Sequence, residues 1–179
     1  MAKIAIPIVR VMCEDGSNDY NVGLNPNTNT PEKVQAFTDC FHEGANMVYN
    51  LCHRFPVRLT LAMWGAESGW GQNIDQYRNQ NWANMIYTSA TNPVGNIGKG
   101  VKNFAMFEGR NHHAIAFGYF FQNNPRYSAL INYLKSTSSP DIQTCITHIA
   151  QAGYCEGDPS TYVNFIMACV NTVLNHSGI

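Results

Sequence analysis

The chain has 179 residues, of which 45% are hydrophobic and only 13% are charged, and its formal net charge is −1. The hydrophobic share excludes an intrinsically disordered chain, and the length suits one domain. The near-neutral charge leaves no basic surface for nucleic acid and no polybasic patch for a membrane. No apolar run approaches the roughly 18 residues that a membrane span needs.

The amino-terminal part is predicted to be irregular up to a clear helix start. Residues 1–30 form an extension that ends in an Asn-, Pro- and Thr-rich stretch typical of turns. Thr30 and Pro31 then suit the N-cap and the first position of a helix. Apolar side chains at helical spacing predict an amphipathic helix over residues 31–53, which Pro56 ends. The apolar stretch at the start is too short for a signal-peptide core, so we expect no general secretory route.

A second helix is predicted from Val57 to about Ala66, and Glu67 follows at its end. Because this helix is apolar nearly all round, it should be the buried central helix. Residues 72–111 are rich in Asn and Gly and lack a helical period. They predict a small irregular or β lobe, where we expect the substrate to be contacted.

The remaining chain is predicted to be helical over residues 112–121, 126–134 and 141–150, and a last helix begins at Asp158 as N-cap. The core face of the last helix is predicted to hold Val163, Ile166, Met167, Val170, Val173 and Leu174. Since no repeat or linker interrupts the chain, the sequence predicts a single, mainly α domain over residues 1–179.

The six cysteines are Cys13, Cys40, Cys52, Cys145, Cys155 and Cys169, and none forms a C-x-x-C pair. This argues against a zinc ribbon or a thioredoxin-type site. Two interpretations stay open: buried free thiols, or one to three disulfides formed in an oxidising compartment such as a periplasm. Cys40 and Cys52 should not pair, because twelve residues on one helix span about 18 Å.

Glu67 is the strongest candidate for chemistry. It follows an apolar helical stretch that carries no carboxylate, and Trp64 and Trp70 flank it. A carboxyl group in such surroundings loses hydration of its ionised form, which raises its pKa. A raised pKa suits a general acid at neutral pH.

Four segments together resemble the glucosaminidase family (glycoside hydrolase family 73) of the lysozyme-like superfamily. They are residues 67–71 (E-S-G-W-G), 81–85 (N-W-A-N-M), 125–127 (P-R-Y) and 153–162, which begin with G-Y and end with D-P-S-T-Y. The segments occur in the family's order over roughly residues 55–175. The resemblance implies a lysozyme-like glucosaminidase fold.

The resemblance also implies roles for single residues. Glu67 matches the acid that protonates the leaving glycosidic oxygen, and Tyr154 matches a cleft tyrosine that orients the N-acetyl group of the substrate. Asn81 and Trp82 match the cleft floor, and Trp82 and Trp70 are candidates for stacking on sugar faces. Tyr162, by contrast, is expected to pack the last helix.

The second catalytic group stays open. Many relatives have a second carboxylate in the small lobe, yet this chain has no Asp or Glu between Asp75 and Glu108. We rank assistance by the substrate's own acetamide, oriented by Tyr154, first, Glu108 second and Asp75 third.

The sequence indicates no metal site and no cofactor. His112 and His113 are adjacent, so on a helix their side chains point about 100° apart and rarely share an ion. Lys99 and Lys102 are either solvated lysines or contacts for peptide and lactyl carboxylates of the substrate.

The resemblance implies a peptidoglycan hydrolase of the endo-β-N-acetylglucosaminidase type. Since no signal peptide, anchor or wall-binding repeat is recognised, the chain is similar to the glycoside hydrolase effectors of type VI secretion. Such a toxin leaves the producing cytoplasm by a non-Sec route, acts in the target-cell periplasm and is blocked by a cognate immunity protein. A muramidase or a phage-type endolysin is the close alternative. A non-catalytic glycan-binding module on the same fold is the alternative of another class.

Overall fold

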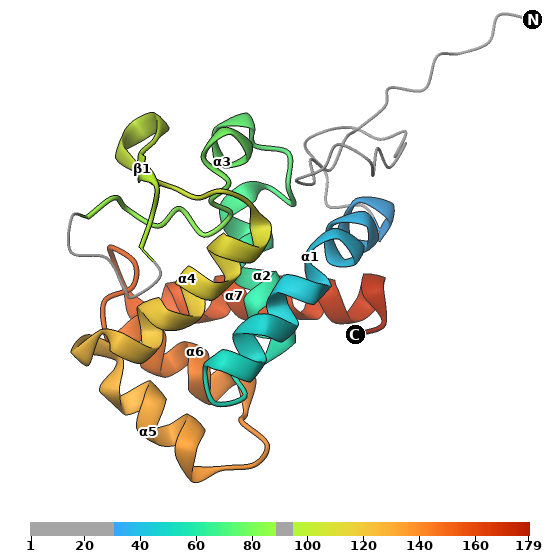
Figure 1. Cartoon of the computed structure of the whole chain (residues 1–179). Coiled ribbons are helices and arrows are strands. Elements are labelled where there is room, and N and C mark those ends of the chain that lie inside the picture. The colour runs from blue at the N-terminus through green and yellow to red at the C-terminus, as the bar shows by residue number, and fades with distance from the viewer. Residues whose placement is uncertain (1–30, 89–94) are drawn as a thin grey trace, which may run out of the picture.

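The computed structural model describes residues 31–88 and 95–179, which form a body of helices with a small lobe beside it (Figure 1). The helices are α1 (Pro31–Leu51), α2 (Val57–Ser68), α3 (Ile74–Asn79), α4 (Arg110–Asn123), α5 (Ser128–Ser136), α6 (Ile142–Gln151) and α7 (Pro159–Ser177). The strands are β1 (Gly98–Lys99) and β2 (Ala105–Met106), and two 3-10 helices are η1 (Val101–Asn103) and η2 (Pro125–Tyr127). In Figure 1, α3 and β1 lie at the top of the view and α5 lies at the bottom.

The central helix is α2, as its apolar sequence predicts. It packs against α1 and α7, while α1 also packs against α4. Its fully buried apolar side chains include Leu59, Leu61, Ala62 and Met63. The helix continues to Ser68, two residues beyond the predicted end, so Glu67 lies in its last turn.

A tight turn follows α2 and fixes the direction in which Glu67 is presented. Gly69 and Trp70 both have positive φ, of 59° each, and the Trp70 amide donates to the Gly65 carbonyl oxygen at 2.8 Å. The Ser68 hydroxyl donates to the Trp64 carbonyl oxygen at 2.7 Å. The Trp70 ring folds back over Gly65 so closely that a Cβ there would lie 2.6 Å from the ring. Glycine at position 65 is therefore required by this close approach.

The small lobe follows, as predicted for residues 72–111, but it also contains the helix α3. Asn73 caps α3 by accepting from the Asp75 amide at 3.0 Å. The strands β1 and β2 pair antiparallel, with Gly98 opposite Met106. The sequence missed α3 because six residues with no apolar period carry little helical signal.

Two buried asparagines hold the lobe together. Asn81 donates from Nδ2 to the Ala105 carbonyl oxygen at 2.8 Å and to the Met85 carbonyl oxygen at 2.9 Å. Its Oδ1 accepts from the Met85 amide at 3.0 Å. Asn79 likewise bonds both the amide and the carbonyl of Val101, at 2.8 and 3.1 Å.

The helices of the second half are confirmed. Asp141 and Asp158 are the N-caps of α6 and α7, each accepting from the amide three residues on at 2.8 Å. Tyr162 is buried, as expected for a residue that packs the last helix. The prediction for Leu174 is wrong, because its side chain is 44% exposed on the outer side of α7. Within the described part of the chain, no helix combines the length and the apolar character that a membrane crossing requires.

An aromatic cluster at the centre of the body encloses His113 of α4. The imidazole is fully buried and lies within 4.9 to 5.5 Å of the rings of Trp64, Trp82 and Phe107. Neither ring nitrogen has a hydrogen-bond partner among the described residues. Burial lowers the pKa of His113 from 6.5 to about 3, so the imidazole is neutral.

Four of the six cysteines carry free thiols, namely Cys52, Cys145, Cys155 and Cys169. Two or three disulfides are therefore excluded, and Cys52 does not pair with Cys40, as its position on the helix predicts. Cys13 and Thr30 lie outside the described residues. A single disulfide stays a prediction.

Candidate active site

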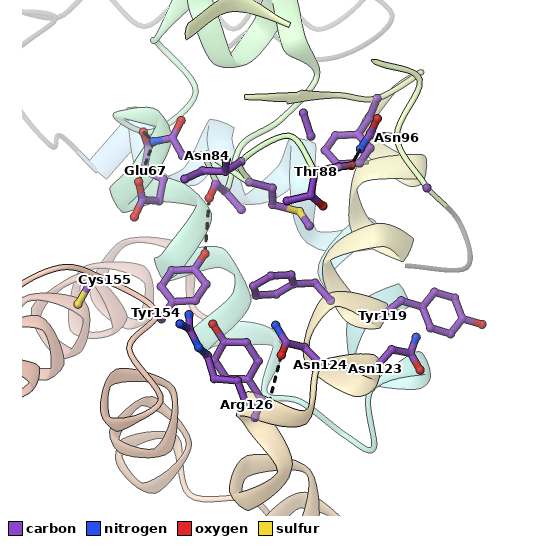
Figure 2. Close-up of a pocket in the computed structure, with 18 of the residues that line it drawn as sticks. Glu67, Asn84, Thr88, Asn96, Tyr119, Asn123, Asn124, Arg126, Tyr154 and Cys155 are labelled. Atoms are coloured by element: carbon purple, nitrogen blue, oxygen red, sulfur yellow. Dashed lines mark hydrogen bonds between the residues drawn. The ribbon is translucent and has the colours of Figure 1, made fainter. Parts of the chain in front are cut away.

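A cavity of about 990 Å³ opens between the small lobe and the body, beside the last turn of α2 (Figure 2). Its volume is at the upper end of the usual range for ligand sites. The walls come from α2, the lobe, the end of α4, η2 and the turn between α6 and α7. The lining residues are Glu67, Ala83, Asn84, Met85, Ile86, Thr88, Gly95, Asn96, Ala105, Phe107, Tyr119, Phe120, Asn123, Asn124, Pro125, Arg126, Tyr127, Tyr154 and Cys155.

Glu67 lies at the edge of this cavity with its carboxyl group largely withdrawn from water. Burial raises the pKa of Glu67, and the hydrogen bond from Asn84 opposes this in part. Asn84 Nδ2 donates to Glu67 Oε2 at 2.7 Å (Figure 2). Gln76 in turn donates to Asn84 Oδ1, so the amide of Asn84 is oriented from its other side. The raised pKa of Glu67 agrees with its apolar setting in the sequence, and its hydrogen bond to Asn84 is an addition that the sequence did not predict.

The bond from Asn84 engages one of the two oxygens of the Glu67 carboxyl group. Oε2 accepts from Asn84, so it serves as the carbonyl oxygen of the acid. Oε1 makes no hydrogen bond to another described residue, so it is the oxygen from which we expect a proton to be donated.

Tyr154 stands in the wall of the cavity, directly after Gly153 in the turn that follows α6. Its ring stacks on Phe121 with the centroids 5.9 Å apart, and its hydroxyl donates to the Ala83 carbonyl oxygen at 3.5 Å (Figure 2). The pKa of Tyr154 lies well above its ordinary value, mainly because of burial and then because of Tyr162 and Glu67. The hydroxyl therefore stays protonated. Its oxygen keeps lone pairs with which it can accept from a ligand N–H.

The two candidates for a second carboxylate lie outside the cavity. Asp75 forms an ion pair with Lys102, with 2.6 Å between Oδ2 and Nζ. Glu108 has a side chain that is 77% exposed, 4.0 Å from Nδ1 of His112. Neither lines the cavity, so Glu67 is the one carboxyl group among the lining residues that the structure describes. Lys102 is likewise engaged outside the cavity.

The three side chains expected to touch sugars are in the core. Trp70 and Trp82 are 3% and 1% exposed, and both rings pack against aromatic residues of α1. Asn81 is 1% exposed, and its side-chain amide makes hydrogen bonds to the backbone of the lobe. The three residues are buried and do not line the cavity. In this structure their side chains are not exposed to a ligand, so the expected contacts with substrate are not formed.

Several residues that line the cavity were not predicted from the sequence. Asn84 is the most important of them. The one indication in the sequence was that it belongs to the N-W-A-N-M segment, because its side chain reaches Glu67 only in the folded chain. Arg126 lies in the P-R-Y segment, which forms η2, and Phe120 lies on the preceding helix α4. Cys155 follows Tyr154 directly and is a partly exposed thiol.

No metal centre is formed by the described residues: no three His, Cys, Asp or Glu side chains among them lie close enough together to hold an ion. His112 bonds the Gly95 carbonyl oxygen at 3.2 Å, and His113 is enclosed by aromatic rings. The chemistry available to the described lining residues is thus that of one carboxylic acid with hydroxyl, amide, guanidinium and thiol groups.

Comparison with known proteins adds two matches. The glucosaminidase family model, described as mannosyl-glycoprotein endo-beta-N-acetylglucosaminidase, matches residues 45–175. A solved structure of a type VI secretion system effector-immunity complex from Pseudomonas protegens is similar in fold, with a TM-score of 0.59 and 16% sequence identity. The alignment covers 82% of this chain and 95% of that chain. No curated protein matches the sequence significantly. The mainly α fold expected for the lysozyme-like superfamily is confirmed.

Proposed function

Because this chain belongs to the glucosaminidase family and is a glycoside hydrolase that acts on peptidoglycan, we propose that it is an endo-β-N-acetylglucosaminidase with Glu67 as its acid. The observation that carries the assignment is the desolvated Glu67 carboxyl group, held by Asn84 at the edge of the large cavity. A raised pKa lets a carboxylic acid hold its proton to a higher pH than an ordinary carboxyl group, which suits a general acid.

The first half of the reaction breaks the glycosidic bond. Glu67 gives its proton from Oε1 to the leaving oxygen as the bond to the sugar carbon breaks. The carbonyl oxygen of the substrate's acetamide attacks the same carbon and forms a cyclic oxazolinium. Tyr154 accepts a hydrogen bond from the acetamide N–H while it donates to the Ala83 carbonyl oxygen, which orients the group for attack.

The second half restores the acid. The Glu67 carboxylate takes a proton from water as the water oxygen attacks the sugar carbon, and the oxazolinium opens back to the acetamide. Asn84 stabilises the carboxylate in this interval, since its N–H bond lowers the pKa that burial raises. This route needs one carboxyl group, which agrees with the lining of the cavity. Glu108 and Asp75 rank behind it because both lie outside the cavity.

We further propose that the protein is an antibacterial effector that acts on the peptidoglycan of a target-cell periplasm, and that an immunity protein blocks its cavity. The similarity in fold to a protein of a type VI secretion system effector-immunity complex supports this. Expression in a bacterial cytoplasm should be tolerated, whereas export to the periplasm should lyse the cells. Equal toxicity in both compartments would contradict it.

The test of the enzymatic proposal is digestion of purified sacculi by the parent and by Glu67→Gln. The variant should fold normally and lose about 10²- to 10⁴-fold in rate. Mass spectrometry of the products identifies the reducing-end sugar, which is N-acetylglucosamine for this proposal and N-acetylmuramic acid for a muramidase. Lys135→Gln, which removes a charge on α5 outside the cavity, is the control and should cleave like the parent. A parent that binds glycan without cleaving it would instead be a binding module.

A further inference from the structure

The cavity carries one cationic side chain among its described lining residues, and that side chain has no assigned role. Arg126 belongs to η2 and lies in the wall beneath Tyr154, while Glu67 lies above Tyr154 at the other edge (Figure 2). The three labelled side chains thus run across the cavity in the order Glu67, Tyr154, Arg126. A ligand that reaches Glu67 past Tyr154 therefore extends toward a guanidinium group.

The Arg126 side chain is anchored by the turn at Gly153. Nη1 donates to the Gly153 carbonyl oxygen at 3.1 Å, and Asn124 Oδ1 accepts from the Arg126 amide at 3.1 Å. A bond to the neighbouring Tyr127 side chain adds to this. The fold thus fixes the guanidinium group before a ligand arrives, which reduces the entropy that binding would cost.

The guanidinium group keeps donors for an acceptor from outside. Arginine has five N–H donors in a planar fork that matches a carboxylate. Among the described residues, no carboxylate lies within ion-pairing distance of Arg126. The residue is exposed, so a ligand can approach it from the cavity. An unpaired cation at one end of a cavity whose other end holds the acid favours a substrate with a negative charge at a fixed distance from the scissile bond.

We propose that Arg126 forms a carboxylate subsite and makes the enzyme selective for glycan strands that are negatively charged beside the cleaved bond. This inference rests on the proposed function, because it places the strand across Glu67 and Tyr154. In peptidoglycan the shared chemistry has two sources. One is the lactyl carboxylate of a muramic acid without its stem peptide, and the other is a carboxylate of the stem peptide.

The test measures binding rather than cleavage. Glu67→Gln is titrated calorimetrically with soluble strands of two kinds, one with intact stem peptides and one freed of them by an amidase. Each kind is used as such and after its carboxyl groups have been converted to neutral amides. The same four strands are then given to the double variants of Glu67→Gln with Arg126→Gln, Arg126→Lys or Lys135→Gln. The last variant removes the same charge from α5 outside the cavity.

Glu67→Gln should bind at least one charged strand about fivefold to tenfold more tightly than its amidated counterpart, which is the range for a partly exposed charge-assisted pair. Preference for the strands without stems identifies the lactyl carboxylate, and preference for the stemmed strands identifies the peptide. Arg126→Gln should remove the preference, Arg126→Lys should keep part of it, and Lys135→Gln should keep all of it. The preference should also shrink as salt is raised.

Two results would overturn the proposal. One is equal affinity of Glu67→Gln for charged and amidated strands. The other is an Arg126→Gln variant that weakens binding of both strands by the same factor, which would mean that Arg126 only braces the turn at Gly153. Failure of the proposed function is separate: the parent would then cleave no strand, or its products would end in N-acetylmuramic acid, whatever its binding preference.

Discussion

Replacing His113 by phenylalanine should make this protein much less sensitive to mild acid. Most of the loss in unfolding free energy that the parent shows on acidification should be absent from the variant. The imidazole is fully buried among aromatic rings, and neither nitrogen has a hydrogen-bond partner among the described residues. Phenylalanine therefore breaks no described hydrogen bond at this position. Because its ring is somewhat larger, we expect a packing cost of about 1 kcal/mol at neutral pH.

The magnitude follows from the pKa of His113, which burial lowers from 6.5 to about 3. Since the folded pKa is below the unfolded one, the unfolded chain takes up the proton first. The neutral imidazole stabilises the fold fully above pH 6.5, and this contribution is lost as the pH falls toward 3. At pH 4.5, two pH units below the unfolded pKa, the loss is about 2–3 kcal/mol.

Urea unfolding at pH 7.0 and pH 4.5 measures this loss for the parent and for His113→Phe. The difference in unfolding free energy between the two pH values should be about 2–3 kcal/mol smaller in the variant. Phe117→Leu is the control, because it disturbs the same aromatic cluster without a titrating group and should shift stability equally at both pH values. If parent and His113→Phe lose the same stability on acidification, the imidazole is not the group responsible.

Three further predictions concern the site. Gly65→Ala should lower the unfolding free energy by about 1–3 kcal/mol in a thermal melt, although alanine normally favours a helix, because its Cβ would lie 2.6 Å from the rigid Trp70 ring. Cys155 should react first with maleimide among the four free thiols, because it alone is partly exposed, and the adduct should slow sacculus cleavage. Its reaction rate should rise with pH as the thiolate forms, and at a higher pH than for an ordinary thiol because burial raises its pKa. Tyr154→Phe should lower turnover with little change in sacculus binding, while Glu108→Gln should retain most activity. A Glu108→Gln variant as inactive as Glu67→Gln would replace the assisted mechanism with a two-carboxylate one.

The helices could be predicted because their signals are local. Pro56 separates α1 from α2, and Asp141 and Asp158 form N-caps with amides three residues away. Apolar spacing does the rest in helices of this length. The exposure of Leu174 could not be predicted in the same way. Whether an apolar residue on a helix is covered depends on how far the neighbouring helices extend, and the sequence of the helix itself does not show this.

The site was predictable only in part, because burial depends on contacts far along the chain. Glu67 and Tyr154 could be named from their segments. Trp70 faces the core because two successive positive φ angles turn it back over Gly65, and no pattern in the sequence prescribes that turn. Asn84 holds the acid from seventeen residues away, a contact that exists only once the lobe has folded.

The surroundings of Glu67 reconcile two opposed requirements. A general acid must be withdrawn from water to keep its proton, yet it must reach the substrate and then survive as an anion. The apolar helix α2 provides the first, since its burial raises the pKa of Glu67, and the turn at Gly69 ends the helix before the carboxyl group is enclosed. Asn84 provides the second, because its N–H bond is strongest to the carboxylate that remains after proton donation. In the proposed mechanism Glu67 acts as acid and then as base, since no other carboxyl group among the described residues lines the cavity. The balance of burial against one hydrogen bond suits it for both roles.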